Sequence, residues 1–355
     1  MLKQRLSDGY FAAKEALQDW LGNRNVARLA GIVGLVYVLL VTGFGMYWSL
    51  TPDHPPLQYD RDNGSRAVVG TATTSALIDV AEILLDKPGG FLSNDITPPG
   101  VLMDNMPAWE YGVLMQVRDL SRAMRESYSR SQSQSQEDPD LAKAEPRFNF
   151  SSNSWAVPAS ESEYRQGIRY LKSYRSRLGD VDQPQAQFYA RADNLRYWLA
   201  VVESRLGSLS QRLSASVGRP RVNTDLANDP SARQSTPSAS EQRVKTPWLQ
   251  IDNVFFESRG SAWALIHFLK AAEHDFADVL ENKNATVSLR QIIRELEGTQ
   301  QLLFSPMVLN GSGFGLLANH SLVMASYISR ANAAIIDLRD LLAQEIGRAS
   351  CRERV

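Results

Sequence analysis

Cysteine and histidine are scarce in this chain of 355 residues, which contains one cysteine and four histidines. The single cysteine, Cys351, has no partner for an intramolecular disulfide. The zinc motifs CxxC and HExxH and the nucleophile motif GxSxG are missing. The formal net charge of −1 excludes the strong basic excess that is typical of nucleic-acid-binding proteins. We therefore expect no metal, no other cofactor and no nucleic acid partner.

Charge is missing altogether from residues 29–50, LAGIVGLVYVLLVTGFGMYWSL. As a helix this run would rise about 33 Å, which matches a bilayer hydrocarbon core of about 30 Å. One central Asp would oppose insertion by about 3 kcal/mol, and the run has none. The sequence therefore predicts one transmembrane helix in contact with the lipid bilayer. The small-residue pairs Ala27/Gly31 and Ala30/Gly34 would also allow a homo-oligomer through this helix.

Basic residues are distributed asymmetrically around the apolar run. Before it stand Lys3, Arg5, Lys14, Arg24 and Arg28, whereas residues 51–70 contain only Arg61 and Arg66. Because basic flanks stay in the cytoplasm, we expect a single-pass protein of the bacterial inner membrane with residues 1–28 cytoplasmic and the body periplasmic. A cleaved signal peptide is the alternative, but the apolar run is too long and no A-x-A-like site follows it.

Beyond residue 68 the apolar residues recur at helical spacing. One heptad run, which predicts a helix over residues 185–217, contains Phe188, Ala192, Leu195, Leu199, Val202, Leu206, Leu209 and Leu213. Another contains Met324, Ile328, Ala331, Ile335, Leu338 and Leu342. Several such runs in one chain favour pairing within the chain over an intermolecular coiled coil. We predict an all-α fold in which the transmembrane helix precedes an elongated antiparallel bundle of long helices.

Proline-rich and polar stretches divide the chain into segments. We assign residues 51–68 to an extended exit linker, 69–218 to a first helical half and 247–345 to a second. Residues 219–246, rich in Pro, Ser, Asn, Asp and Thr, are assigned to a polar linker between the halves. The last stretch, residues 346–355, does not continue the helical pattern, and we expect it to be a non-native tail.

The segment 86–112, DKPGGFLSNDITPPGVLMDNMPAWEYG, combines Gly and Pro with many apolar residues. Such a composition predicts a structured loop laid against the bundle rather than a continuous helix. Its candidate binding residues are Asn94, Asp95, Asp104, Asn105, Trp109 and Glu110. They would line a cleft in one interpretation, and in the other the Asn and Asp side chains cap turns and helix ends.

A second candidate polar cluster lies in one predicted helix and contains Glu257, Arg259, His267 and His274. Glu257 and Arg259 are two residues apart and therefore lie on different faces of a helix. An ion pair to another helix is one interpretation and a role in catalysis the other. The histidines are seven residues apart, a spacing that is unusual for metal ligands.

Three separated motifs together resemble a known bacterial family. They are DKPGGFLSNDITPPGVLMDNMPAWEYG, FFESRGSAWAL, and SPMVLNGSGFG followed by SYISRANAAIIDLRDLL. In this order they resemble the domain-of-unknown-function family 2333, and the similarity extends from Val69 to Leu342. The resemblance implies a Gram-negative, single-span inner-membrane protein. It implies no activity, and the last ten residues depart from the family pattern.

These features predict a membrane-anchored periplasmic protein that acts as a structural or protein-interaction component of the cell envelope. Segment 86–112 would be the recognition surface for an envelope protein partner. Two alternatives stay open. A ligand-sensing or solute-binding module would need a pocket of several hundred Å³ with convergent polar groups. An envelope hydrolase, the least favoured class, would need titratable groups that converge in one site.

Overall fold

Helices make up most of the computed structural model, which describes residues 24–56, 68–131, 136–180, 186–222, 241–305, 307–312 and 316–344. The predicted all-α bundle with one apolar N-terminal helix is confirmed. Most of the predicted cytoplasmic segment, residues 57–67 of the exit linker and the tail 346–355 lie outside the described residues.

The helices of the described chain follow in this order: α2 Arg24–Trp48, α3 Thr71–Asp86, α4 Asn105–Ala123, α5 Leu141–Phe148, α6 Ser160–Leu178, α7 Ala192–Ser214, α8 Ile251–Asp275, α9 Ala277–Asn282, α10 Thr286–Gly298 and α11 His320–Ala343. A π-helical turn at Met124–Tyr128 extends α4, and short 3₁₀ turns lie at Gly100–Leu102, Ala215–Val217 and Trp248–Gln250. The apolar helix α2 is the one described helix long and apolar enough to cross a membrane, and none of its apolar window is buried.

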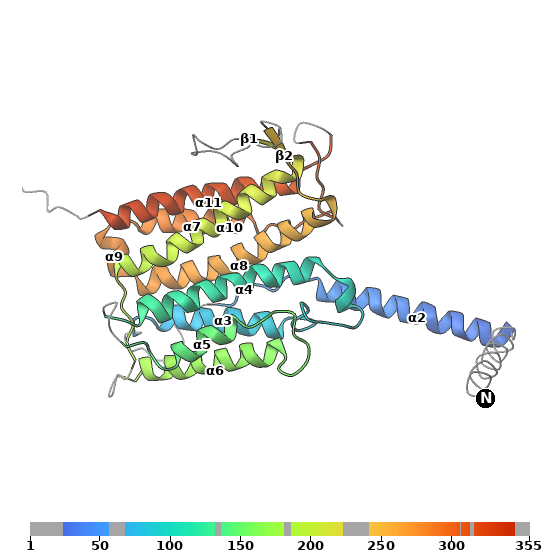
Figure 1. The fold of residues 1–355 in the computed structure, drawn as a ribbon, viewed down its shortest axis with the longest axis horizontal. Coiled ribbons are helices and arrows are strands. Elements are labelled where there is room, and N and C mark those ends of the chain that lie inside the picture. The colour runs from blue at the N-terminus through green and yellow to red at the C-terminus, as the bar shows by residue number, and fades with distance from the viewer. Residues whose placement is uncertain are drawn as a thin grey trace, which may run out of the picture.

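The body helices lie side by side along one long axis (Figure 1). Helix α4 packs along α8 in the middle, α7 and α10 pack against α11 on one side, and α3, α5 and α6 complete the other side. One continuous hydrophobic core joins the helices before residue 219 to those after residue 247. Helix α2 leaves one end of this body and continues in about the same direction.

The two ends of the body have names that we keep below. The anchor end, where α2 leaves, is formed by residues 87–104, 149–159, 248–250, 299–305, 307–312 and 316–319 (Figure 1). The distal end is formed by residues 68–70, 129–131, 136–140, 179–180, 186–191 and 276–285. Successive connections alternate between these ends because helices that follow one another in the sequence run antiparallel.

The heptad residues of α7 and α11 form the contact between these two helices. Leu195, Leu199, Val202, Leu206, Leu209 and Leu213 of α7 and the whole predicted run of α11 are buried. The predicted start of the first of these helices is wrong, because α7 begins at Ala192. The backbone N–H of Tyr189 instead donates to the carbonyl of Tyr128 at 2.6 Å, and Phe188 packs edge-on against Tyr128 and Phe276.

Helices α4 and α8 approach each other so closely that two glycines are required. A β-carbon on Gly112 would lie 2.1 Å from the carbonyl oxygen of Glu257, and one on Gly260 would lie 2.1 Å from that of Trp109. Because backbone atoms cannot move aside like a flexible side chain, any larger residue would push the helices apart. These two glycines therefore fix the centre of the bundle.

The predicted polar linker 219–246 is more ordered at its ends than the composition indicated. Strands β1 Arg219–Val222 and β2 Glu241–Val244 pair antiparallel, with Arg219 opposite Val244 and Val222 opposite Glu241. Backbone hydrogen bonding across the two ends of a closed loop explains this short ladder. The intervening residues 223–240 lie outside the described part of the chain.

Candidate functional site

A buried ion pair organises the loop of segment 86–112, which was predicted to be a recognition surface for an envelope protein partner. The Lys87 ammonium lies 2.6 Å from Glu110 Oε1, and both side chains are fully buried. Glu110 also accepts from the backbone N–H groups of Leu92 and Ser93, each at 2.8 Å, while Lys87 donates to the Gly90 carbonyl. Burial raises the pKa of Glu110, and the nearby Lys87 opposes that shift. Glu110 therefore holds the loop rather than facing a cleft.

The other polar candidates of the loop have separate roles. Asn94 is buried and donates through Nδ2 to the Ser154 carbonyl and to Glu161, each at 2.8 Å. Asp104 is exposed at the start of α4, and the buried Oδ1 of Asn105 has no hydrogen-bond partner within the described residues. Burial and the carboxylate of Glu161 raise the pKa of Asp95.

Trp109 belongs to the core and helps to hold the chain that follows α2. Its fully buried ring lies 5.2 Å from the ring of Trp263 in α8. The indole Nε1–H of Trp263 donates to the Pro52 carbonyl at 3.0 Å, and His54 Nε2 donates to the Trp263 carbonyl at 3.1 Å. The chain that leaves α2 is therefore fixed to the central helix of the body.

The histidines of α8 do not converge on one site. His267 is buried, and burial followed by the nearby His54 lowers its pKa to about 4. His274 lies 3.4 Å from the neighbouring carboxylate of Asp275. Within the described residues, no three His, Cys, Asp or Glu side chains lie close enough to hold a metal ion.

The two predicted polar clusters meet at a shallow hollow of about 460 Å³. Asp95 and Asp104 from the loop and Glu257 from α8 line it, together with Tyr111 and other residues. Glu257 is already engaged, because both of its oxygens accept from Arg212 of α7 at 2.7 Å. The predicted ion pair to another helix is thus present at Glu257, on a half-buried side of the bundle.

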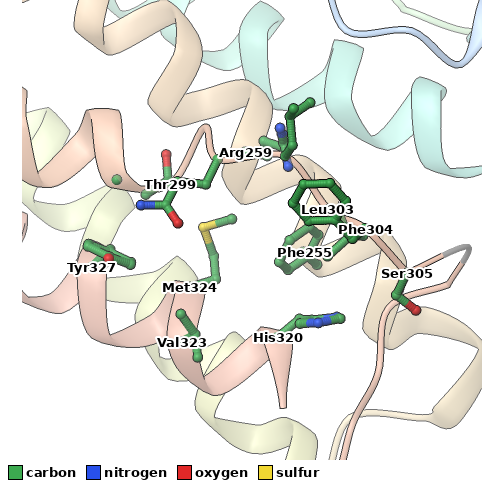
Figure 2. Close-up of a pocket in the computed structure, with 13 residues that line it drawn as sticks. Phe255, Arg259, Thr299, Leu303, Phe304, Ser305, His320, Val323, Met324 and Tyr327 are labelled. Atoms are coloured by element: carbon green, nitrogen blue, oxygen red, sulfur yellow. The ribbon is translucent and has the colours of Figure 1, made fainter. Parts of the chain in front are cut away.

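Arg259 lies elsewhere, in an apolar pocket of about 470 Å³ (Figure 2). Three parts of the chain line this pocket: α8, the end of α10 with the loop that follows it, and the first turns of α11. The labelled apolar side chains around Arg259 include Phe255, Leu303, Phe304 and Met324. The pocket lies at the anchor end, because α10 ends and α11 begins there.

The charge of Arg259 has no acidic counterpart in the described chain. The residue is only 7% exposed, burial lowers its pKa, and no ion pair joins it to a carboxylate within the described residues. One terminal nitrogen donates to the Gln300 carbonyl at 3.0 Å, while the buried Nε has no partner within the described residues. A buried cation of this kind costs free energy unless a ligand supplies the anion.

His320 adds a second polar group to the pocket. Its Nδ1 accepts from the backbone N–H of Leu309 at 3.0 Å, so Nε2 carries the proton when the ring is neutral. The residue also begins α11, whose first turn carries partial positive charge. Arg259, His320 and this helix end together favour an anionic group beside an apolar one.

Arg259 was a candidate from the sequence, but the rest of this pocket was not predicted. The apolar residues that the connection between α10 and α11 contributes are Leu302, Leu303 and Phe304, which directly precede the motif SPMVLNGSGFG. One signal was available, because residues 299–319 contain no Asp, Glu, Lys or Arg. A long uncharged apolar connection is unusual for a solvated turn.

The fold and the pocket define an all-α protein with an apolar helix at one end and, near that same end, a buried arginine that has no acidic partner within the described residues. Residues 22–345 match the family model of an uncharacterized protein conserved in bacteria (DUF2333), and the chain belongs to this family. The predicted family is therefore confirmed. Comparisons with curated proteins and with solved structures returned no match.

Proposed function

We propose that this protein is a membrane-anchored binding module that holds an amphipathic anionic ligand in the pocket around Arg259. The ligand class has an apolar body for Phe255, Leu303 and Met324 and a carboxylate or phosphate for Arg259. The observation that carries the proposal is a buried guanidinium without an acidic partner in the described residues. The pocket volume of about 470 Å³ is within the range of small-molecule sites.

The proposal also places the protein in the cell. Helix α2 spans the bacterial inner membrane, residues 1–28 face the cytoplasm and the body faces the periplasm. The uncharged run of residues 29–50 within and after α2, and the basic residues before that run, support this orientation. A phosphatase reporter fused after Ala343 should be active and a cytoplasm-dependent fluorescent reporter dark. The reverse result would overturn the orientation.

Ligand binding is tested with full-length protein in a mild detergent. We expect a fluorescent long-chain fatty acid to bind, and its uncharged methyl ester to bind at least about tenfold more weakly, because only the acid supplies an anion to Arg259. Arg259→Gln should abolish that preference for the acid. The matched control is Arg294→Gln, which removes an exposed arginine of α10. Equal affinities for acid and ester in the unmodified protein would refute the proposal.

A protein-interaction role in the envelope is the second candidate. The exposed hollow lined by Asp95, Asp104 and Glu257 supports it, because a basic partner segment would find the carboxylates of Asp95 and Asp104 there, beside a Glu257 that Arg212 already engages. Crosslinking in membranes from a Tyr111→Cys position beside this hollow should then capture one partner protein. Loss of that product in an Asp95→Asn, Asp104→Asn double variant would support the role, and an unchanged product would contradict it.

A further inference from the structure

We propose that the anchor end of the body is itself a membrane-docking surface that inserts apolar side chains into the interface of the bilayer crossed by α2. This inference rests on the proposed membrane anchoring of α2, but it does not depend on the ligand pocket. It assigns the bilayer as the partner of loops that no helix of the described chain covers.

Exposed large apolar side chains gather at the anchor end. Each of its four connections contributes at least one such side chain, and examples are Leu102, Trp155, Val157, Trp248, Phe304 and Leu316. Phe304 is 95% exposed and Val157 fully so. Exposed apolar groups of this number and size, gathered on one surface, mark an interaction site rather than ordinary solvated surface.

Two of these four connections are also depleted in charge, whereas residues 87–104 contain Lys87, Asp95 and Asp104. Residues 149–159 and 299–319 contain no Asp, Glu, Lys or Arg at all. The connections at the distal end differ, since residues 129–140 and 276–285 both carry several charged side chains. Among the described distal residues, Val69 is the large apolar side chain that is exposed, and Val287 follows just inside α10. The charged residues of the distal end are suited to contact with water, and the exposed apolar residues of the anchor end are suited to contact with a lipid interface.

The joint between α2 and the body gives this surface a fixed direction. Trp48 at the end of α2 packs against Gly89, where an added β-carbon would overlap the indole ring at 2.7 Å. One turn earlier, a β-carbon on Gly45 would lie 3.7 Å from Cβ of Pro99. With the hydrogen bond from Trp263 to Pro52, these contacts fix α2 where it meets the anchor end. A bilayer around α2 would therefore meet that end.

Docking would also decide where the pocket opens. Leu302 and Phe304 are highly exposed and at the same time line the pocket around Arg259. Their insertion at the interface would let an amphipathic ligand pass between bilayer and pocket without crossing water. The bilayer is then both the docking partner and the source of the ligand.

The experiment uses full-length protein in vesicles of phosphatidylcholine and phosphatidylglycerol. The background variant is Cys351→Ser, so that one introduced cysteine carries an environment-sensitive fluorophore. The labelled positions are Phe304→Cys at the anchor end and Val287→Cys near the distal end, which is a matched exposed apolar position. A third label at Val36→Cys reports on α2 itself. Nitroxide-labelled lipids then quench any fluorophore that touches the bilayer.

We expect lipid nitroxides to quench the fluorophore at Phe304→Cys at least about threefold more than the one at Val287→Cys, with a blue-shifted emission. Quenching at Val36→Cys with none at Phe304→Cys would overturn the docking surface alone. No quenching at either position would overturn the anchoring as well. A fluorophore at Phe304→Cys that is shielded from iodide but untouched by lipid nitroxides would show that a second copy of the chain covers this surface, which also refutes the inference.

Discussion

Ion pairs hold the loops at both ends of the helical body, but the pairs at the two ends differ in their exposure to water. At the distal end, Arg177 reaches the carboxylates of Asp138 and Asp140, each at 2.7 Å, and part of this network remains exposed. At the anchor end, Lys87 and Glu110 pair with no exposure at all, and the loops around them present apolar side chains. Charges that keep partial contact with water tie the distal loops, whereas charges that are fully removed from water tie the anchor loops.

This difference in the ion pairs indicates which end of the bundle is suited to contact with water. An exposed ion pair stabilises a protein by about 1 kcal/mol or less, and it needs no other support. A buried pair needs every remaining donor and acceptor to be satisfied, which the backbone around Glu110 provides. The Lys87–Glu110 pair therefore depends on complete internal pairing of its own polar atoms.

The largest expected effect comes from breaking the buried pair. Glu110→Gln leaves Lys87 buried without its anion, and we expect the free energy of unfolding to fall by about 3–5 kcal/mol. Urea titration of the protein in mild detergent measures this loss. Asp138→Asn, the matched change at the distal end, should cost about 1 kcal/mol. Equal losses at the two ends would remove the contrast between them.

Stability should depend on pH through His267, which lies in α8 between the two ends of the body. Because the pKa of His267 is lowered to about 4 from its ordinary 6.5, the unfolded chain binds more protons between these values. Stability should be unaffected by this residue above pH 6.5 and should fall by about 1.4 kcal/mol per unit as the pH drops toward 4. The pKa of His54 is lowered by burial as well, so it adds a slope of the same sign.

The measurement is the difference in unfolding free energy between the unmodified protein and His267→Leu at several pH values. Taking the difference cancels the slopes of other groups, such as Asp79, whose pKa burial raises to about 6. If the difference in unfolding free energy does not change between pH 7 and pH 5, the fold does not lower the pKa of His267.

A smaller effect is expected at the helix contact between the two ends. Gly260→Ala should lower the free energy of unfolding by about 1–3 kcal/mol, because the new methyl group meets the carbonyl of Trp109. Gly207→Ala in α7 is the control, since its β-carbon meets only the amide of Asn332 at 3.6 Å. Alanine there should stabilise the helix by up to about 1 kcal/mol. Two losses of similar size would contradict the close packing of α4 on α8.

The smallest effect should be a gain. Arg259→Met removes a buried charge that has no anion in the described chain, so the unliganded protein should gain about 1 kcal/mol in urea titration while it loses the ligand. Arg294→Met, on the exposed face of α10, should change stability by less than about 0.5 kcal/mol. A clear loss of stability at Arg259→Met would mean that the residue has a structural role at the anchor end.

Much of the fold follows from local patterns that can be read along the chain. The leucines of α7 and the apolar run of α11 are buried because residues seven apart share one helix face, whatever partner covers it. The pattern fails at Phe188, which fits the heptad but lies outside the helix. A hydrogen bond from Tyr189 to Tyr128, which stands 61 residues earlier in the chain, decides that local structure.

The candidate site was less accessible to sequence reasoning. Glu110 and Arg259 were both named as polar candidates, yet one is paired within the core and the other has no anion in the described chain. Whether the charge of each residue is balanced by an opposite charge depends on residues that are distant in sequence and close in the folded protein. Lys87 follows the end of α3, and the pocket walls come from three separated segments. The spacing of residues along the chain does not show which side chains will be in contact in the folded protein.

By itself the sequence determined the helices, the single apolar helix long enough to span a bilayer and the family, because periodicity and composition act within a few turns of chain. Only the tertiary structure decided that the uncharged connections 149–159 and 299–319 share an end with α2 and that Arg259 is buried among apolar side chains. The physical reason is that charge compensation and exposure depend on distances in space, which the packing of α4, α7, α8 and α11 sets.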